Sequence, residues 1–389
     1  MSRDAFAGLR VRLVAHLRAR GDVRTERVAA AFARVPRHVF VPGLSAEDVY
    51  ADRSIAIKLE DGIPISSSSQ PAIMAEMLEM LALREGDRVL EIGAGSGYNA
   101  ALIAELVGPR GFVETIDLDD DLIAAARRHL DDAGYPQVHT LLSDGAQGDP
   151  GGAQFDAIIA SVGVERIPPA WIAQVRTGGR LVAPLTVRAM QKVVAFERTA
   201  NGLESRAIVD AGFMMLRGPS ATSDSVSVPL GDPSLTLRAF AERAAGIDPA
   251  AVLAALHGRS DDELPSRRMR VEDVWNGFSL WLAMRDDAFC RLTAQGSGAQ
   301  AGIVPNLSPG ADSLYGFATT FGLYERGELV AFAPRSSFEL TVRRFGAHAG
   351  GLARMQSAIA AWDDAGRPGN AQLRIAIDLG GTAHAELRG

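Results

Sequence analysis

Residues 88–97, RVLEIGAGSG, place a short apolar run directly before a glycine-rich turn. The run is typical of a strand buried on both faces, as in a parallel sheet. Gly93, Gly95 and Gly97 then allow the backbone to approach a ligand closely, because glycine has no Cβ atom. In an open α/β sheet, ligands bind at the carboxyl ends of the strands. The stretch therefore predicts a strand, a ligand-binding turn and a helix, in that order.

The alternation of strand and helix continues beyond this turn. The predicted helices are 98–108 and 120–134, and the further predicted strands are 111–119, 138–145, 155–163 and 178–185. Strands that alternate with helices at this spacing favour a mostly parallel sheet covered on both faces. We therefore predict an α/β, Rossmann-like fold.

The chain has 389 residues, which is long for one hydrophobic core. A polar, turn-rich stretch at 218–234 marks a boundary. Beyond it we expect an α+β region, with helices at 235–259, 271–286 and 350–366 and a strand at 372–379. The predicted regions are an N-terminal helical, substrate-binding segment (1–85), a cofactor-binding core (86–217) and a C-terminal α+β extension that helps to recognise the substrate (218–389).

Composition excludes several classes of function. The net charge of −7, without a Lys/Arg block, disfavours nucleic acid as a partner. The single cysteine, Cys290, excludes an internal disulfide and fits a reducing cytoplasm. No metal site is predicted, because the histidines form no HxxxH pair and there is no CxxC. No apolar run is long enough for a membrane span, and nothing indicates the oligomeric state.

The glycine turn separates two classes of cofactor. A dinucleotide fingerprint, G-x-G-x-x-G, requires glycine at position 98, where this chain has Tyr98. A nicotinamide oxidoreductase is therefore disfavoured. Glu91 followed by G-x-G-x-G instead resembles motif I of the class I methyltransferases, which use S-adenosylmethionine (AdoMet) and release S-adenosylhomocysteine. For this stretch alone, a purely structural turn is the alternative.

Acidic residues at two later strand ends fit the same resemblance. Asp117 closes the second predicted strand, where a carboxylate can accept hydrogen bonds from ribose hydroxyls. Asp144 closes the third, matching the acidic residue that meets the adenine amino group in these enzymes. The alternative for each is a capping or turn role. The predicted cofactor-binding residues are Glu91, Gly93, Ala94, Gly95, Gly97, Asp117, Leu118, Asp144 and Gly145.

Four serines, Ser66 to Ser69, precede Gln70-Pro71 and an apolar run with helical spacing. They form either a flexible linker or the start of a helix, where hydroxyl and backbone N–H groups can bind an anion. Pro71 suits a first helical turn. We favour the helix start, with capping as the role of three serines and Ser69 as the functional one.

Three short motifs stand before the glycine turn: Phe40-Val41-Pro42, Val49-Tyr50-Ala51-Asp52 and Ser67-Ser68-Ser69-Gln70-Pro71. They resemble the F-V-P, A/V-Y-x-D and T-I-S-x-P motifs of the protein L-isoaspartyl O-methyltransferase family, and the likeness extends over about residues 20–217. It implies that Ser69 lies beside the carboxylate to be methylated, and Ser69 is the predicted catalytic residue. The predicted substrate-binding residues are Val41, Tyr50, Asp52, Ser66, Ser67, Ser68 and Gln70.

The chemistry that the resemblance implies agrees with these residue types. A carboxylate acceptor is already ionised near neutral pH, so methyl transfer to it requires alignment rather than a strong base. The absence of a His/Asp dyad among the motifs is therefore no objection.

Two features differ from the repair enzymes of this family. Ser66-Ser67-Ser68 stand where Q-T-I is usual, and residues 218–389 follow the shared part. Both are similar to C-terminally extended actinobacterial relatives associated with tailoring of ribosomal peptides (lanthipeptides and graspetides). We therefore predict methylation of an aspartate side chain in a constrained ribosomal peptide, leading through a succinimide (aspartimide) to isoaspartate. The open alternatives are repair of isoaspartate in damaged proteins and a non-catalytic AdoMet-binding module.

Overall fold

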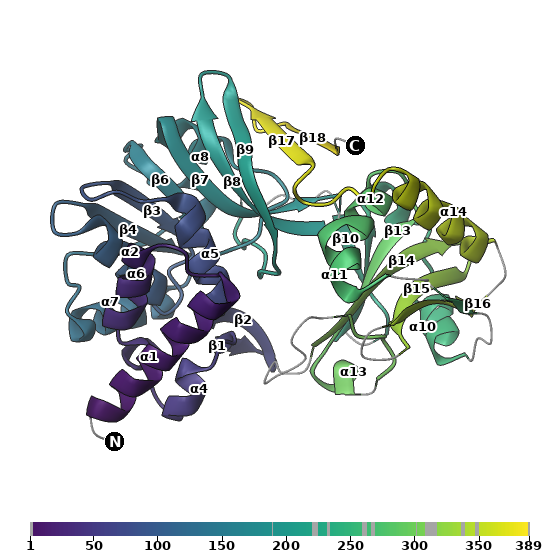
Figure 1. Cartoon of the computed structure of the whole chain (residues 1–389), viewed down its shortest axis with the longest axis horizontal. Helices are drawn as coiled ribbons and strands as arrows, with labels where there is room; N and C mark the ends of the chain where they lie inside the picture. Colours follow the sequence, from purple (N-terminus) through teal and green to yellow (C-terminus); the bar gives the residue numbers. More distant parts are fainter. Residues whose placement is uncertain are drawn as a thin grey trace. The chain divides into compact units, whose positions relative to one another are not determined.

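The computed structural model of the chain describes residues 3–188, 190–219, 225–231, 234–258, 263–265, 269–300, 302–307, 317–335, 339–346 and 350–387. They form two compact units (Figure 1). Unit 1 comprises the described residues within 1–185, 191–222 and 375–384, and unit 2 those within 186–190, 223–374 and 385–389. Each unit has its own sheet and its own hydrophobic core.

The central sheet of unit 1 has the strand order β18-β17-β9-β8-β7-β6-β3-β4-β5 among the described residues. Its strands are β3 (Arg88–Ile92), β4 (Phe112–Asp117), β5 (His139–Leu142), β6 (Phe155–Ala160), β7 (Val175–Val187), β8 (Met190–Thr199), β9 (Gly202–Asp210), β17 (Leu373–Asp378) and β18 (Ala383–Leu387). Strands β5, β4, β3, β6 and β7 are parallel to their neighbours in that series, whereas β9 pairs antiparallel with β8 and β17. The carboxyl ends of five parallel strands thus share one edge.

Strand β3 lies in the middle of the parallel region, as its apolar sequence predicts. Val89, Leu90 and Ile92 are at most 1% exposed, and burial of each such side chain stabilises the fold by about 1.5–3 kcal/mol. The helices around it are α5 (Pro71–Leu81), α6 (Tyr98–Val107), α7 (Asp120–Ala133) and α8 (Pro169–Gln174). Helices α6 and α7 pack on β4 and end at Gly108 and Gly134, as predicted.

Four helices precede the sheet: α1 (Arg3–Arg20), α2 (Glu26–Arg34), α3 (Arg37–Phe40) and α4 (Ala46–Tyr50). Their buried side chains form one core with those of α5 and α6. Tyr98, at the position that excludes a dinucleotide fingerprint, is part of it. Its ring lies between Phe32 and Phe40, with centroids 6.4 and 5.5 Å away. The large side chain at 98 therefore anchors the N-terminal helices on α6.

A hairpin of β1 (Ile55–Glu60) and β2 (Ile63–Ser68) follows these helices. Ser68 pairs with Ile55, Ser67 with Ala56 and Ser66 with Lys58. The prediction that the serines form the start of a helix is therefore wrong for three of them. They are drawn into an extended strand by an earlier segment of the chain, and helix α5 begins only at Pro71.

Unit 2 has an antiparallel sheet with the order β10-β11-β13-β14-β15-β16-β12. The strands are β10 (Ser225–Pro229), β11 (Leu235–Phe240), β12 (Glu263–Pro265), β13 (Phe289–Gln295), β14 (Phe317–Glu325), β15 (Glu328–Pro334) and β16 (Leu340–Gly346). The helices are α9 (Ala241–Ala244), α10 (Pro249–His257), α11 (Val271–Asp273), a π-helical turn (Val274–Phe278), α12 (Ser279–Ala283), α13 (Gly296–Gln300) and α14 (Gly351–Asp364).

The predicted helix at 235–259 is wrong over its first part. Residues 235–240 form β11, in which Leu235, Leu237 and Ala239 point alternately into the core of unit 2. That alternation of period two is the signature of a half-buried strand.

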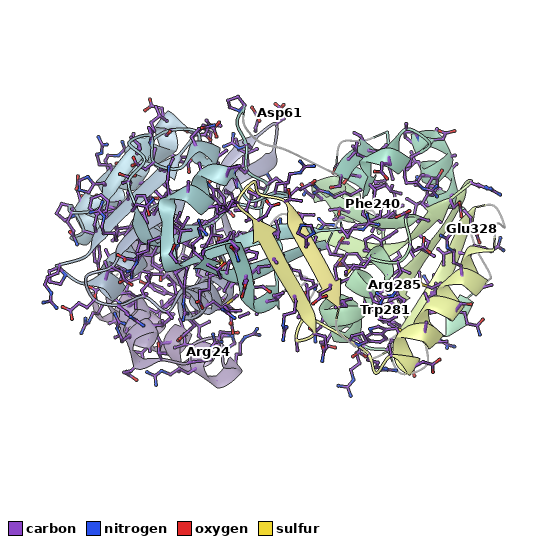
Figure 2. All side chains as sticks on the ribbon, turned by 90° about the horizontal axis from the view of Figure 1, so that it is seen from above. Arg24, Asp61, Phe240, Trp281, Arg285 and Glu328 are labelled. Atoms are coloured by element: carbon purple, nitrogen blue, oxygen red, sulfur yellow. The ribbon has the colours of Figure 1, made fainter. Side chains whose placement is uncertain are left out.

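Near the end of α12, Arg285 stacks on Trp281, with the guanidinium carbon 3.3 Å from the ring centroid (Figure 2).

The chain returns to unit 1 near its C-terminal end. β17 pairs with β9 through Ile377 and Leu203, and residues 375–384 belong to unit 1. Among the described residues, no helix has the length and hydropathy of a membrane span. Nor does this part of the chain contain a group of three or more potential metal ligands.

Candidate active site

The turn between β3 and α6 contains three glycines with positive φ, namely Gly93 (94°), Gly95 (49°) and Gly97 (87°). Such left-handed backbone favours glycine. The N–H of Gly93 donates to the carbonyl of Ile116 at 2.8 Å, which ties the turn to the end of β4. A Cβ atom on Gly97 would lie 3.2 Å from the carbonyl oxygen of Ala126 in α7. The glycines thus permit both the turn and the close packing of the helices beside it.

Asp117 ends β4 next to this turn. Its Oδ2 accepts a hydrogen bond from the N–H of Gly95 (2.9 Å), and its Oδ1 accepts one from the N–H of Asp119 (3.3 Å). Burial raises the pKa of Asp117, against the effect of these N–H donors. Ala94 in the turn is buried, and Leu118 is half-buried. The carboxylate is thus fixed at the sheet edge, and each oxygen retains capacity for a hydroxyl donor.

Asp144 follows β5, the next strand along the same edge. Its Oδ1 accepts a hydrogen bond from the N–H of Ala146 at 3.0 Å. Its Oδ2 is buried and has no donor among the described residues. A Cβ atom on Gly145 would lie only 2.6 Å from Cγ2 of Ile92, so this position requires glycine. Asp144 therefore presents an unused acceptor to a ligand's N–H group.

Glu91 lies inside β3, beneath the glycine turn, and is completely buried. Its carboxylate accepts hydrogen bonds from Nδ2 of Asn99 and Oγ1 of Thr115, each at 2.7 Å, and from Oγ of Ser161 at 3.5 Å. Burial raises the pKa of Glu91 to about 7. The network joins β3 to α6, β4 and the end of β6. The predicted contact of Glu91 with a cofactor stays a prediction.

Two of the four serines, Ser66 and Ser67, lie against the glycine turn. A Cβ atom on Gly95 would come within 3.7 Å of the carbonyl oxygen of Ser67 and 3.8 Å of Oγ of Ser66. Ser68 is 4% exposed, and its Oγ has no partner among the described residues. Ser69 follows the strand and is half-buried. The structure thus brings together the predicted acceptor-binding and cofactor-binding segments.

Asp52 reaches the same place from the end of α4. Its Oδ2 accepts a hydrogen bond from Nε2 of Gln70 (3.0 Å), and its Oδ1 accepts one from the N–H of Ala72 (2.9 Å). Ala72 belongs to the first turn of α5, so Asp52 caps this helix from a distant part of the chain. The capping role predicted for the serines is wrong. We call Asp52 and residues 69–72 the acceptor corner.

This arrangement fits AdoMet. Gly95 allows close approach of a ligand, Asp117 can accept hydrogen bonds from a ribose diol, and the unused oxygen of Asp144 can accept one from an adenine amino group. The sequence model of the protein-L-isoaspartate(D-aspartate) O-methyltransferase family matches residues 10–216. The chain belongs to this family.

Individual members of the family are close in sequence to the matched part. Protein-L-isoaspartate O-methyltransferase of Methanopyrus kandleri is 39% identical over 198 residues, 51% of this chain and 85% of that protein. The protein of the same name from Methanoculleus marisnigri is 40% identical over 211 residues, 54% of this chain and 92% of that protein. A solved protein-L-isoaspartate O-methyltransferase has a TM-score of 0.55 at 22% identity, covering 98% of this chain and all of that chain. At this identity the likeness shows the fold.

Family membership confirms three predictions. The fold is that of a class I AdoMet-dependent methyltransferase, the enzyme class is that of the carboxyl O-methyltransferases, and the cofactor of the family is AdoMet. The family match ends at residue 216, whereas the fold likeness extends over unit 2 as well.

Two residues taken from the family motifs pack in the core formed by the N-terminal helices. Tyr50 is buried, and its hydroxyl shares a hydrogen bond of 2.8 Å with Nδ1 of His38, on which Phe6 stacks. Val41 is buried in the same core. Packing explains both positions, and their predicted contacts with substrate stay predictions.

Four charged residues beside the glycine turn are not indicated by any family motif. Lys58 on β1 forms ion pairs with Asp119 (3.2 Å) and Asp121 (2.6 Å), and Arg217 pairs with Asp119 at 2.6 Å. These pairs join the β1–β2 hairpin, the segment after β4 and the segment after β9. Only the tertiary structure could identify them, because the partners are far apart in sequence and lysine, arginine and aspartate are common on surfaces.

Proposed function

We propose that this chain methylates the free carboxylate of isoaspartate residues in proteins, with AdoMet as the methyl donor. The observation that supports the proposal best is the contact between the serine segment and Gly95, inside the region that the family model matches. The relatives from Methanopyrus and Methanoculleus carry this activity in their names, and the chain covers most of their length.

The residues of the site have distinct proposed roles. AdoMet, when bound, supplies an electrophilic methyl group on a sulfonium centre. Asp117, at the end of β4, would hold the ribose hydroxyls, and Asp144, which follows β5, would hold the adenine amino group. The hydroxyl of Ser69 donates a hydrogen bond to the acceptor carboxylate and holds it without protonating it. The carboxylate is ionised near neutral pH, so no residue has to remove a proton.

Alignment supplies most of the rate enhancement in this scheme. A well-oriented pair of reactants gains about 7–11 kcal/mol over free encounter. A single hydrogen bond to a charged group is worth only about 1.5–3 kcal/mol. Ser69 therefore contributes mainly by fixing the position of the acceptor carboxylate. The rate of methyl transfer then depends on the rigidity of the acceptor corner.

A second candidate acceptor is an aspartate side chain in a constrained ribosomal peptide, with the ester closing to a succinimide and opening to isoaspartate. The observation in its favour is Ser68, whose buried hydroxyl has no partner among the described residues and stands where isoleucine is usual in the family. Unit 2 does not favour this candidate, because a solved protein named for isoaspartate methylation shares the fold over 98% of the chain.

One assay separates the candidates. The full chain is incubated with methyl-labelled AdoMet and three peptides of one sequence: linear with isoaspartate, linear with aspartate, and cyclic with aspartate. We expect base-labile label on the linear isoaspartyl peptide. Label on the cyclic aspartyl peptide alone would replace the main proposal by the second. Tight binding of S-adenosylhomocysteine without label on any peptide would favour a non-catalytic AdoMet-binding module.

Ser69→Ala tests the role of the hydroxyl. We expect kcat to fall by about 10- to 100-fold, while the Kd of S-adenosylhomocysteine, measured by calorimetry, changes less than about twofold. Ser45→Ala is the matched control, because this hydroxyl accepts a hydrogen bond from the N–H of Asp48 and caps α4 outside the site. It should lower stability by about 1 kcal/mol and leave kcat unchanged. Loss of cofactor affinity with normal turnover in Ser69→Ala would contradict the placement.

A further inference from the structure

A buried arginine connects the parts of the proposed site. Arg37 begins α3 and is 0% exposed. Its Nη1 donates a hydrogen bond to the carbonyl of Ala51 (3.3 Å), and its Nη2 donates to the carbonyls of Arg53 (3.2 Å) and Ser69 (3.0 Å). Among the described residues, no carboxylate forms an ion pair with it. The guanidinium is therefore bound by three carbonyl groups, and the charge of Asp52 acts on it without forming an ion pair.

The carbonyl groups that Arg37 binds define the acceptor corner. Those of Ala51 and Arg53 flank Asp52, whose carboxylate in turn holds Gln70 and the first turn of α5. The third belongs to Ser69 itself. One guanidinium thus fixes both the residue that caps α5 and the residue proposed to bind the acceptor.

The same guanidinium rests on the element that begins at the glycine turn. Its central carbon lies 5.6 Å from the centroid of the Tyr98 ring, and Tyr98 is the first residue of α6, directly after Gly97. The ring face attracts a cation electrostatically, and more strongly where both are removed from water. Arg37 therefore has the acceptor corner on one side and the start of α6 on the other.

The arrangement depends on properties that only arginine has. Burial lowers the pKa of Arg37, which reflects the unfavourable transfer of a cation from water without a paired anion. The planar guanidinium can bind several carbonyl groups in fixed directions, whereas a lysine ammonium is a point charge without that fork geometry. A buried cation of this kind is hard to explain by stability alone, because apolar side chains of similar volume would often stabilise the fold as well.

We propose that Arg37 is a positioning residue for methyl transfer, holding Ser69 and the acceptor corner in fixed register with the glycine turn. The proposal rests on the proposed function of Ser69. Its physical basis is alignment: a misplacement of about 1 Å in a reacting pair can lower a rate about 100-fold. Arg37 is fully buried and donates to the backbone carbonyl of Ser69, so in this proposal it acts through Ser69 and not by contact with the substrate.

The first test compares two conservative substitutions. Arg37→Lys should lower kcat for the linear isoaspartyl peptide by about 10- to 100-fold and change the Kd of S-adenosylhomocysteine less than about twofold. The control is Arg27→Lys. Arg27 also donates to backbone carbonyls of two segments, those of Leu83 and Leu106, but outside the acceptor corner. It should lower the melting temperature and leave kcat unchanged. A normal kcat in Arg37→Lys with lowered stability would reduce Arg37 to a structural role.

The second test is a double-mutant cycle with Ser69→Ala. If Arg37 acts through Ser69, Arg37→Lys should lower kcat less than about threefold in the Ser69→Ala background, because coupled residues are not additive. An equal fold-change in both backgrounds would overturn the proposal.

A crystal structure separates failure of this proposal from failure of the proposed function. In Arg37→Lys bound to S-adenosylhomocysteine, Ser69 should be displaced while Gly93 to Gly97 keep their positions. An unmoved Ser69 would refute the positioning role, even if no isoaspartyl peptide is a substrate of the natural chain. Absence of methyl transfer by the natural chain, with Ser69 displaced in the variant, would reject the function and retain Arg37 as the residue that holds the corner.

Discussion

The buried glutamate beneath the glycine turn should make unit 1 less stable as pH rises. Glu91 has a pKa of about 7 in the folded chain, chiefly because of burial, against an ordinary value of 4.5. An unfolded chain therefore loses this proton near pH 4.5, whereas the folded chain keeps it to about pH 7. Between these limits the folded state binds more protons, so the free energy of unfolding falls with rising pH and levels off above pH 7.

The size of the effect follows from the same two values. At about 1.36 kcal/mol for each tenfold change in proton affinity, the interval from 4.5 to about 7 corresponds to about 3 kcal/mol. Glu91→Gln removes the titration and can keep both short hydrogen bonds. The amide oxygen can accept from Nδ2 of Asn99, and the amide N–H₂ can donate to the hydroxyl of Thr115, which is able to accept.

We therefore expect the stability of Glu91→Gln, relative to the natural chain, to rise by about 3 kcal/mol between pH 4 and pH 8. The measurement is hydrogen exchange at amides of β3 and β4 in increasing urea, which reports unit 1 rather than unit 2. Thr115→Val is a matched variant, because it removes a hydrogen-bond donor that favours the ionised form of Glu91. The free energy of unfolding should then depend more steeply on pH. In the Glu91→Gln background the same substitution should leave the pH dependence unchanged. A stability difference that is flat from pH 4 to pH 8 would refute the reasoning.

Two further substitutions test the cofactor site. Asp144→Asn places an N–H₂ group where the unused Oδ2 lies, at the position proposed to bind the adenine amino group, and should weaken S-adenosylhomocysteine binding by about 5- to 100-fold. S-inosylhomocysteine, which has an oxygen in place of the amino group, should lose less affinity in calorimetry, and an equal loss for both ligands would contradict the assignment. Tyr98→Gly completes a dinucleotide fingerprint but removes the ring between Phe32 and Phe40, so we expect about 3–5 kcal/mol less stability in urea unfolding and no binding of NADH. Saturable NADH binding by this variant would show that Tyr98 alone prevents it.

The family model matches residues 10–216, whereas the fold likeness to the solved protein-L-isoaspartate O-methyltransferase covers 98% of the chain. Apart from residues 186–190, the match at 10–216 lies within unit 1, and unit 2 has its own sheet and core. We propose that unit 2 contributes to substrate recognition, because a unit with its own core can be added without altering the acceptor corner. The affinity of the natural chain for the isoaspartyl peptide can be compared with the methylation of each peptide in the assay above. The comparison will show which acceptor the full chain, with both units, uses.

The parts of the site that could be predicted from sequence are those in which neighbouring residues decide the structure. A buried strand, three glycines and a helix follow one another at 88–107, and Asp117 and Asp144 stand at the ends of apolar strands. Parallel strands bring their carboxyl ends to one edge, so the order of these local patterns is enough to place the residues together.

The remainder depended on pairing between distant segments. Four consecutive serines have no periodicity, and Ser66 to Ser68 became part of a strand because Ile55–Glu60 pairs with that segment. Arg37 lies 32 positions before the carbonyl that it binds in Ser69, and β17 returns to β9 from beyond unit 2. Sequence determined the strand, the glycine turn and the family motifs, because these are written in contiguous residues. Tertiary structure decided the acceptor corner, because a buried cation and distant carbonyl groups satisfy one another only once the chain has folded.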